Sequence, residues 1–302
     1  MPTHWDFFAD PNVFLDVAGE HLARDPLDTS VVATQADRVR ELLDAGDAVP
    51  DAPHWFAVAR DGDAVVGVAM RTTPVAPHPL YVAALPDGAA AALVDALAAR
   101  GERVGGVNGT LPAARAVADR AARLAGGRVV VPMETRLHEV RAVVLPATVP
   151  AGSARLATPE DAPLLTRWWL AFHADAELQA GRVPAAGTAE EAAAAGERAA
   201  ASVVSRIARG SAWVWDVDGE AVHLTSYAGP AYGVARIGPV YTPPQHRSLG
   251  YAGALVAHVS QLLLDAGHRV CLFTDRANPA STKVYERIGY ERVADTAEHL
   301  VV

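Results

Sequence analysis

The residues best suited to chemistry lie between positions 240 and 290. A strand-like run, 233–241, is stopped by Pro243 and Pro244, and the segment 247–252 then opens an apolar-periodic helix. A loop that leads into a helix presents several unpaired backbone N–H groups and the positive end of the helix dipole to one point. Gly250 is small enough for a ligand to approach the backbone closely. The segment therefore predicts a phosphate-binding loop.

A second group of informative residues follows at a fixed distance. The strand-like run 269–274 leads into a loop with Asn278 and Ser281, and a helical segment bearing Tyr285 precedes the pair 289–290. The order is strand, phosphate loop, helix, strand, Asn-Pro loop and helix with a tyrosine. A short glycine-rich turn occurs often by chance, but the joint pattern is specific.

Together these segments resemble motif A and the following elements of the Gcn5-related N-acetyltransferases (GNAT). In that family an Arg/Gln-x-x-Gly-x-Gly/Ala signature holds the pyrophosphate of acetyl-coenzyme A. The resemblance implies acetyl-CoA as the co-substrate, bound mainly by backbone groups, with the strand before the loop pairing with the pantetheine arm. The predicted cofactor-binding residues are Val240, Tyr241, Thr242, Arg247, Ser248, Leu249, Gly250, Tyr251, Ala252, Asn278, Ser281 and Tyr285.

Two of these residues carry alternatives. Leu249 stands where the family often has a basic residue, so cofactor binding should be somewhat weaker. Asn278 matches the asparagine that hydrogen-bonds the pantetheine arm, but it also suits a turn or helix N-cap before Pro279. Both roles can hold at once.

The resemblance also implies direct transfer to an amine in a ternary complex, without a covalent enzyme intermediate. Tyr285 lies where many relatives place a tyrosine near the coenzyme A sulfur. A phenol with a pKa near 10 is protonated at neutral pH and can donate to the departing thiolate. The alternative for Tyr285 is packing on a buried helix face.

The sequence does not identify the general base, because the strand before the loop has no carboxylate where some relatives carry a glutamate. His223, on a predicted hairpin strand, is the candidate base, although a lone strand histidine is more often a core residue. A water chain could also serve. His173, Asp175 and Glu177, near the end of a predicted helix, are further candidates by chemistry or could contact a cationic acceptor. The predicted substrate-binding residues are His173, Glu177 and Tyr227.

Composition narrows the class of protein. Of the 302 residues 51% are hydrophobic, and the formal net charge is −9. The charge argues against nucleic-acid or anionic-membrane partners. The single cysteine, Cys271, excludes an internal disulfide. No signal peptide, membrane span or metal-ligand spacing is apparent, so we expect a cytoplasmic monomer or homodimer without metal.

The order of elements suggests an internal duplication. The second half, 151–302, predicts two helices, a hairpin, the cofactor strand and the motifs above, with a mobile loop at 180–187. The first half, 1–150, predicts a helical region, a hairpin, a strand at 80–85, helices at 88–99 and 112–125, and strand-like segments at 128–133 and 135–145. The resemblance implies an α/β (α+β) fold of two tandem GNAT-like domains. Each would be a mixed, mostly antiparallel twisted sheet flanked by helices.

The first half lacks the phosphate cradle. Its corresponding turn is 86–90, and Asp87 would place a carboxylate where the anion should sit. We therefore expect 1–150 to be a degenerate domain without a cofactor site and 151–302 to be the catalytic domain. The leading function is an acetyl-CoA-dependent N-acetyltransferase for a small-molecule amine. The alternatives are a non-catalytic CoA-binding regulatory or scaffold protein, another acyl-CoA donor, or a hydroxyl or protein acceptor.

Overall fold

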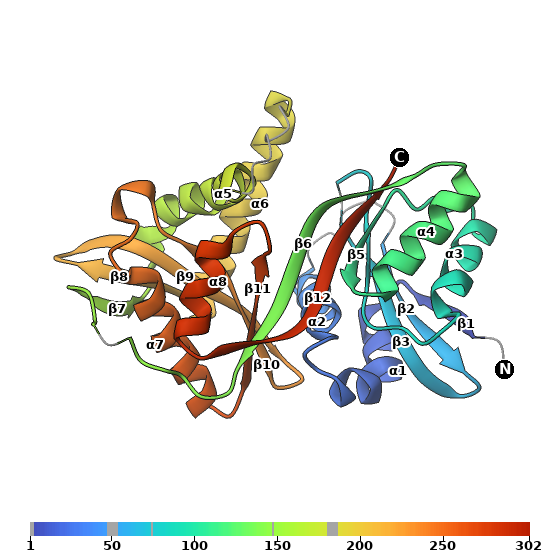
Figure 1. The fold of residues 1–302 in the computed structure, drawn as a ribbon, viewed down its shortest axis with the longest axis horizontal. Coiled ribbons are helices and arrows are strands. Elements are labelled where there is room, and N and C mark those ends of the chain that lie inside the picture. Colours follow the sequence, from blue (N-terminus) through green and yellow to red (C-terminus); the bar gives the residue numbers. More distant parts are fainter. Residues whose placement is uncertain (1–2, 47–53, 74, 147, 180–186) are drawn as a thin grey trace. The chain divides into compact units, whose positions relative to one another are not determined.

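The computed structural model of the chain describes residues 3–46, 54–73, 75–146, 148–179 and 187–302 (Figure 1). It divides into two compact units that interleave in sequence. Unit 1 contains Met1–Arg136, Ala231–Val234 and Ala294–Val302, and unit 2 contains Leu137–Pro230 and Ala235–Val293. The end of the chain thus completes unit 1, a feature that a single boundary at residue 150 does not express. Most of the predicted loop 180–187 lies outside the described residues.

Unit 1 is a mixed sheet with helices on both faces. Its strand order is β1-β2-β3-β4-β5-β12-β6. Each of β1 to β4 is antiparallel to the next strand in this group, whereas β4 and β5 run parallel. The strands are β1 (His4–Phe8), β2 (Trp55–Asp61), β3 (Ala64–Arg71), β4 (Leu80–Val82), β5 (Gly106–Thr110), β6 (Val129–Val140) and β12 (Tyr290–Val301). The helices are α1 (Pro11–Arg24), α2 (Ser30–Asp44), α3 (Ala89–Ala99) and α4 (Ala113–Ala125).

Strand β2 shows why unit 1 is covered on both sides. Ala57 and Ala59 pack with α3 and α4, whereas Phe56 and Val58 pack with α1 and α2. Successive side chains of a strand point to opposite faces, so a continuous apolar run needs a helical layer on each face.

Unit 2 repeats this arrangement. Its strand order is β12-β6-β11-β10-β9-β8-β7, and β6 and β12 contribute different segments to the two units. The strands are β7 (Ser153–Leu156), β8 (Ala212–Val217), β9 (Glu220–Ala231), β10 (Val234–Tyr241) and β11 (Arg269–Asp275). The helices are α5 (Ala162–Gln179), α6 (Ala189–Ala208), α7 (Tyr251–Asp265) and α8 (Pro279–Arg287), with single 3-10 turns at Pro159–Asp161 and Pro244–His246.

The core of unit 2 again has two layers. Leu255 and Ile288 of the α7–α8 side pack on one face, and Leu165 and Trp168 of α5 pack on the other. The predicted fold class, a mixed α/β protein with two similarly ordered units, is confirmed. One difference concerns 128–145, where two strand-like segments were expected and the single strand β6 is found. Its residues up to Arg136 belong to unit 1, and those from Leu137 onward belong to unit 2.

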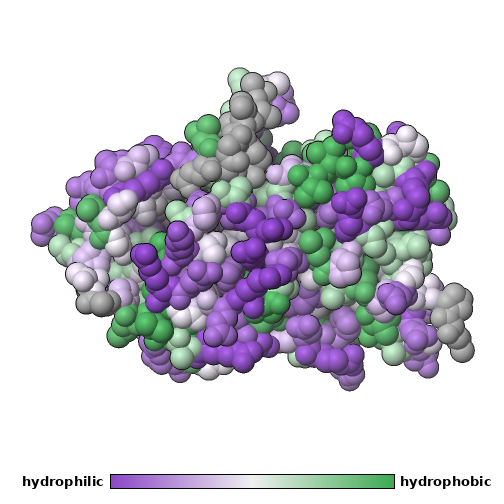
Figure 2. Space-filling model, in the orientation of Figure 1, coloured by the Kyte–Doolittle hydropathy of each residue, from purple (hydrophilic) through white to green (hydrophobic). Residues whose placement is uncertain are grey.

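The surface carries hydrophobic residues in separate groups rather than in one continuous area on the face shown in Figure 2. Leu145, Val149 and Leu178 are among the exposed large apolar side chains. Scattered exposure of this kind is ordinary for a folded surface. None of the helices in the described part of the chain is long and apolar enough to cross a membrane.

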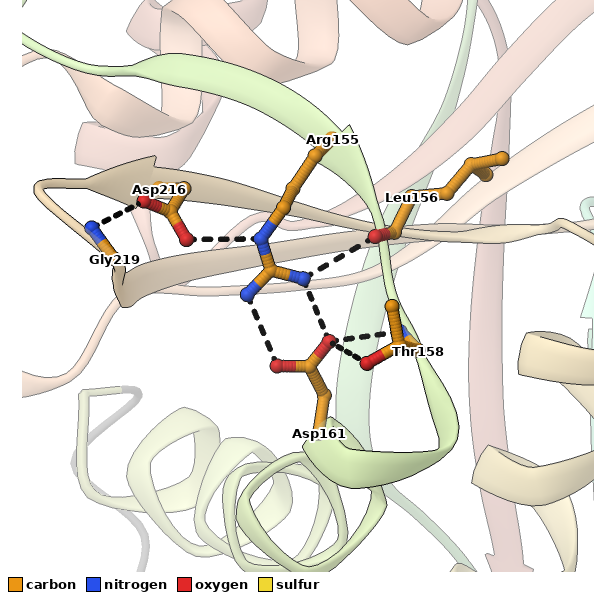
Figure 3. A network of polar contacts seen from close by, with 6 residues as sticks. All are labelled: Arg155, Leu156, Thr158, Asp161, Asp216 and Gly219. Carbon is orange, nitrogen blue, oxygen red and sulfur yellow. Dashed lines mark hydrogen bonds and ion pairs between the residues drawn. The ribbon is translucent and has the colours of Figure 1, made fainter.

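A polar network around Arg155 ties three segments of unit 2 together (Figure 3). Arg155 Nε donates to Asp216 Oδ2 at 2.8 Å, and its Nη1 and Nη2 donate to the two carboxylate oxygens of Asp161 at 2.7 and 3.1 Å. Asp161 also accepts a hydrogen bond from the Thr158 backbone, and Asp216 accepts one from Gly219 N. The network joins β7, the start of α5 and the β8–β9 turn, and the hydrogen bonds with Asp161 raise the pKa of Arg155.

Replacing Arg155 by lysine should lower the free energy of unfolding by about 1–3 kcal/mol, because an ammonium group cannot make the bidentate fork with Asp161. Urea denaturation at pH 7 measures the change. Arg198→Lys on exposed α6 is the matched control and should leave the midpoint unchanged. Equal effects of the two substitutions would show that the network has no stabilising role.

Candidate active site

A cavity of about 690 Å³ lies in unit 2, where β10 and β11 end. Its walls come from α5, β10, the loop before α7, β11 and the start of α8. The predicted cofactor residues that line it are Val240, Tyr241, Thr242, Arg247, Ser248, Ala252, Asn278, Ser281 and Tyr285. The structure therefore brings residues from both predicted motifs into one cavity. The loop residues Leu249, Gly250 and Tyr251 are not among its described lining residues.

The loop before α7 has the backbone form that a phosphate cradle requires. Gly250 is the N-cap residue of α7 with φ 90°, and Ser248 also has a positive φ of 64°. A Cβ at position 250 would meet no atom of the chain closer than 3.9 Å, so glycine is needed for the backbone conformation rather than for space. No side chain caps the first turn of α7. Its N–H groups are therefore available to an anion.

Arg247, the first residue of the loop, is held by groups on the cavity wall. Its Nε donates to Thr242 O at 3.0 Å, and its Nη2 donates to Asp175 Oδ2. The Tyr241 hydroxyl donates to the same oxygen of Asp175 at 3.1 Å. Burial and the bond to Asp175 raise the pKa of Tyr241. The cavity wall thus contains one carboxylate shared by a guanidinium and a phenol.

Asn278 has the capping geometry that its alternative role predicts. Its Oδ1 accepts a hydrogen bond from Ser281 N at 3.2 Å, and Ser281 Oγ donates to Asn278 O at 2.9 Å. Asn278 is the N-cap residue of α8, whose first helical position is Pro279. Both Asn278 and Ser281 also line the cavity, so the capping role and a cofactor contact are compatible.

Tyr285 lies on α8 with its side chain 8% exposed, and it lines the cavity. Its ring packs edge-on against Tyr290, with centroids 6.0 Å apart. Burial raises the pKa of Tyr285. The phenol is therefore protonated at neutral pH and could act as a proton donor to a group in the cavity.

His223 lies behind the cavity wall. It is fully buried on β9, with Nδ1 2.7 Å from Thr242 Oγ1 and Nε2 3.0 Å from Thr225 Oγ1. Burial lowers the pKa of His223 to about 3. The imidazole is neutral at physiological pH, and it contacts the cavity lining at the Thr242 hydroxyl and the Tyr241 backbone.

The predicted acceptor residues lie elsewhere. His173, Glu177 and Tyr227 are not among the described residues that line the cavity, whereas Phe172, Asp175 and Ala176 are. Residues at spacings of three and four share a helix face, so 172, 175 and 176 form one stripe and 173 and 177 fall on the next. The sequence could have indicated this placement, because the spacing of Leu165, Trp168 and Phe172 marks the stripe of α5 that packs on the sheet, and Asp175 continues that stripe.

In unit 1 a carboxylate bonds residues at the ends of the parallel strands β4 and β5. Asp28, from the α1–α2 connection, accepts hydrogen bonds from Ala84 N at 2.7 Å and from Thr110 Oγ1, and so bridges the ends of β4 and β5. A Cβ at Gly109 would lie 2.0 Å from Val82 O, so the two strands are closely paired. Burial raises the pKa of Asp28. That unit 1 binds no cofactor stays a prediction, and Asp28 supplies a physical basis for it.

In the part of the chain that the structure describes, no group of three or more His, Cys, Asp or Glu side chains could hold a metal ion.

Comparison with known proteins assigns the fold. A tandem GNAT protein from the clavulanic acid biosynthesis pathway matches with a TM-score of 0.54 at 15% identity, covering 99% of this chain and 98% of that one. A GCN5-related N-acetyltransferase from Sphaerobacter thermophilus matches with a TM-score of 0.57 at 18% identity, covering 98% and 94%. A Drosophila protein gives a TM-score of 0.64 at 14% identity, covering 99% and 98%.

These likenesses define the class: the chain has the fold of the GCN5-related N-acetyltransferases, and the two-unit arrangement fits the tandem type. More narrowly, residues 225–299, which contain both motifs, match the family model of FR47-like proteins. The resemblance predicted from the sequence is confirmed. A search among curated proteins found no match. The fold and the family model support acyl transfer from a coenzyme A thioester as the class of reaction.

The burial of His223 predicts a pH dependence of stability. Its pKa in the fold, about 3, lies below the value of 6.5 expected when exposed, so its contribution is present above pH 6.5 and is lost as pH falls toward 3. His223→Gln should remove roughly 2–3 kcal/mol of the acid-induced loss between pH 7 and pH 4. Urea unfolding at several pH values measures it. His258→Gln, at an exposed position on α7, should keep the wild-type pH dependence, and an identical dependence in both variants would contradict the neutral, buried histidine.

Proposed function

We propose that unit 2 transfers the acetyl group of acetyl-CoA directly to a primary amine of a small molecule, in a ternary complex. The observation that carries this proposal is the cavity between β10 and β11, which joins the uncapped start of α7 to the buried hydroxyl-bearing ring of Tyr285. One end can hold an anionic phosphate and the other can donate a proton. That pairing is what transfer from a CoA thioester requires.

The chain's own groups fit such a donor. The uncapped N–H groups at the start of α7 suit an anion, and Arg247 adds a positive charge beside them. Thr242, Asn278 and Ser281 offer hydrogen-bonding groups along the cavity. When bound, acetyl-CoA supplies the activated acyl group, and the protein supplies position and charge.

In the proposed reaction the neutral amine attacks the thioester carbonyl, a C–N bond forms and the C–S bond breaks. The leaving thiolate takes the proton of the Tyr285 hydroxyl. The proton lost from the nitrogen passes to solvent, and the phenol regains a proton from solvent. The sum is an amide and a free thiol, with no covalent enzyme intermediate.

The scheme assigns no general base, and the lack of an assigned base favours one competing function. His223 is buried with a strongly lowered pKa, and Asp175 is already paired with Arg247. A CoA-binding regulatory or scaffold protein would need no base. Tyr285 in the cavity argues for turnover, because a regulatory site has no use for a buried proton donor. Another acyl-CoA donor and a hydroxyl or protein acceptor remain alternatives for the same cavity.

We propose further that the protein is a cytoplasmic monomer or homodimer. Unit 1, which corresponds broadly to 1–150, is then a degenerate copy with a structural role, and unit 2, which corresponds to 151–302, is the catalytic copy.

Tyr285→Phe should lower kcat by about 100-fold or more, the usual scale of general acid catalysis, while the Kd for CoA changes less than twofold. Release of free thiol from acetyl-CoA with a panel of primary amines measures kcat, and calorimetry measures the Kd. Tyr290→Phe is the matched control. It removes a buried phenol that bonds Ser260 and touches the Tyr285 ring without lining the cavity. Unchanged turnover in Tyr285→Phe refutes the proton donor, and CoA binding without thiol release across the panel refutes the enzyme.

Gly250→Glu should raise the Kd for CoA by more than 100-fold, because it strains a residue at φ 90° and places a carboxylate at the cradle. Gly88→Glu is the control, since Gly88 is the N-cap residue of α3 in unit 1 with φ 82°. It imposes the same strain away from the cavity and should leave the Kd unchanged. Isothermal titration also reports the stoichiometry: loss of binding in Gly88→Glu, or two CoA molecules per chain, would place a cofactor site in unit 1.

A further inference from the structure

The carboxylate of Asp175 lines the cavity, and it is already bonded to two other groups of the cavity wall. It lies on α5 with its side chain 25% exposed, and its Oδ2 accepts both the Arg247 guanidinium and the Tyr241 hydroxyl. The nearby ring of Phe172 and the side chain of Ala176 complete an apolar stripe on the same helix face. A carboxylate in an apolar wall is suited to bind an ammonium group, but only when its charge is not already neutralised.

Arg247 occupies a position from which it could serve two anions. It opens the cradle of residues 247–252 in sequence, and its side chain is 36% exposed. Its Nε donates to Thr242 O at 3.0 Å, so the planar guanidinium must move as one unit when Nη2 leaves Asp175. Guanidinium groups bind phosphate in the same bidentate manner as carboxylate.

The relative strength of the two partners decides which one Arg247 keeps. A partly exposed ion pair between single charges is weak. A pyrophosphate at the start of α7 carries more charge, and the helix N-terminus holds it next to Arg247. When phosphate is present, the guanidinium is therefore expected to favour it over Asp175.

We propose that Arg247 exchanges partners, from Asp175 in the free protein to the pyrophosphate in the donor complex, and that donor binding thereby exposes Asp175 to an acceptor that carries an ammonium group. Tyr241 then remains as the hydrogen-bond donor that keeps the carboxylate in place. The exchange couples the two substrates: the cavity attracts a cationic acceptor after the acyl donor has entered. It also names the acceptor class, a molecule that carries an ammonium group in addition to the neutral amine that attacks the thioester. This inference rests on the proposed function of unit 2.

The donor arm of the test measures CoA binding by isothermal titration. Asp175→Asn removes the group that competes for Arg247, so CoA should bind about two- to fivefold more tightly. The control Asp218→Asn removes the same charge from the exposed β8–β9 turn and should leave the affinity unchanged. In an Arg247→Ala background Asp175→Asn should have no effect, because the competition acts only through the guanidinium.

The acceptor arm uses the amines that release thiol in the panel assay. Asp175→Asn should raise the KM for the amine at least several-fold while CoA binds more tightly. A merely structural role of Asp175 would weaken both substrates together, and that result overturns the proposal. So does equal CoA affinity of wild type and Asp175→Asn, or the same gain in the Arg247→Ala background. In these cases the acetyltransferase assignment stands, whereas failure of wild-type protein to bind CoA at all overturns the assignment and this inference with it.

Discussion

The left-handed backbone of Gly250 at the start of α7 is the constraint on which the site depends. This conformation turns the chain from β10 into the helix without a capping side chain, so the first N–H groups of α7 stay unpaired. A residue with a Cβ is strained at such a φ angle, and a capping side chain would satisfy the groups that an anion needs. The turn leaves these N–H groups next to the cavity-lining residues Ser248 and Ala252.

The same type of turn occurs at Gly88 in unit 1 without the same result. Gly88 also has a positive φ and precedes an uncapped helix, α3. There, however, Asp87 stands next to the turn and Asp28 bridges β4 and β5. This carboxylate bonds residues at the ends of both strands and adds negative charge at that end of the sheet. A glycine turn is therefore a condition for the cradle but does not create it.

Two groups of ion pairs act in unit 2. Asp175 and Arg247 pair in the cavity wall, and Arg155 with Asp161 and Asp216 holds the start of α5, the helix that carries Asp175. The Arg155 network is bidentate toward Asp161, whereas Asp175 makes its bonds through a single oxygen. We therefore expect the bidentate Arg155 network to stay in place and the Arg247–Asp175 pair to rearrange when a ligand binds.

Local patterns in the sequence determined the phosphate loop, the Asn278 cap, the position of Tyr285 and the alternation of strands and helices, because each depends on neighbours within a few residues. Only the tertiary structure decided which stripe of α5 faces the cavity, which places Asp175 there rather than His173 or Glu177. It also decided that His223 is buried behind Thr242, 19 positions away, and that Asp28 bonds Ala84, 56 positions away. Periodicity specifies which residues share a face, but the packing of distant elements specifies what that face meets.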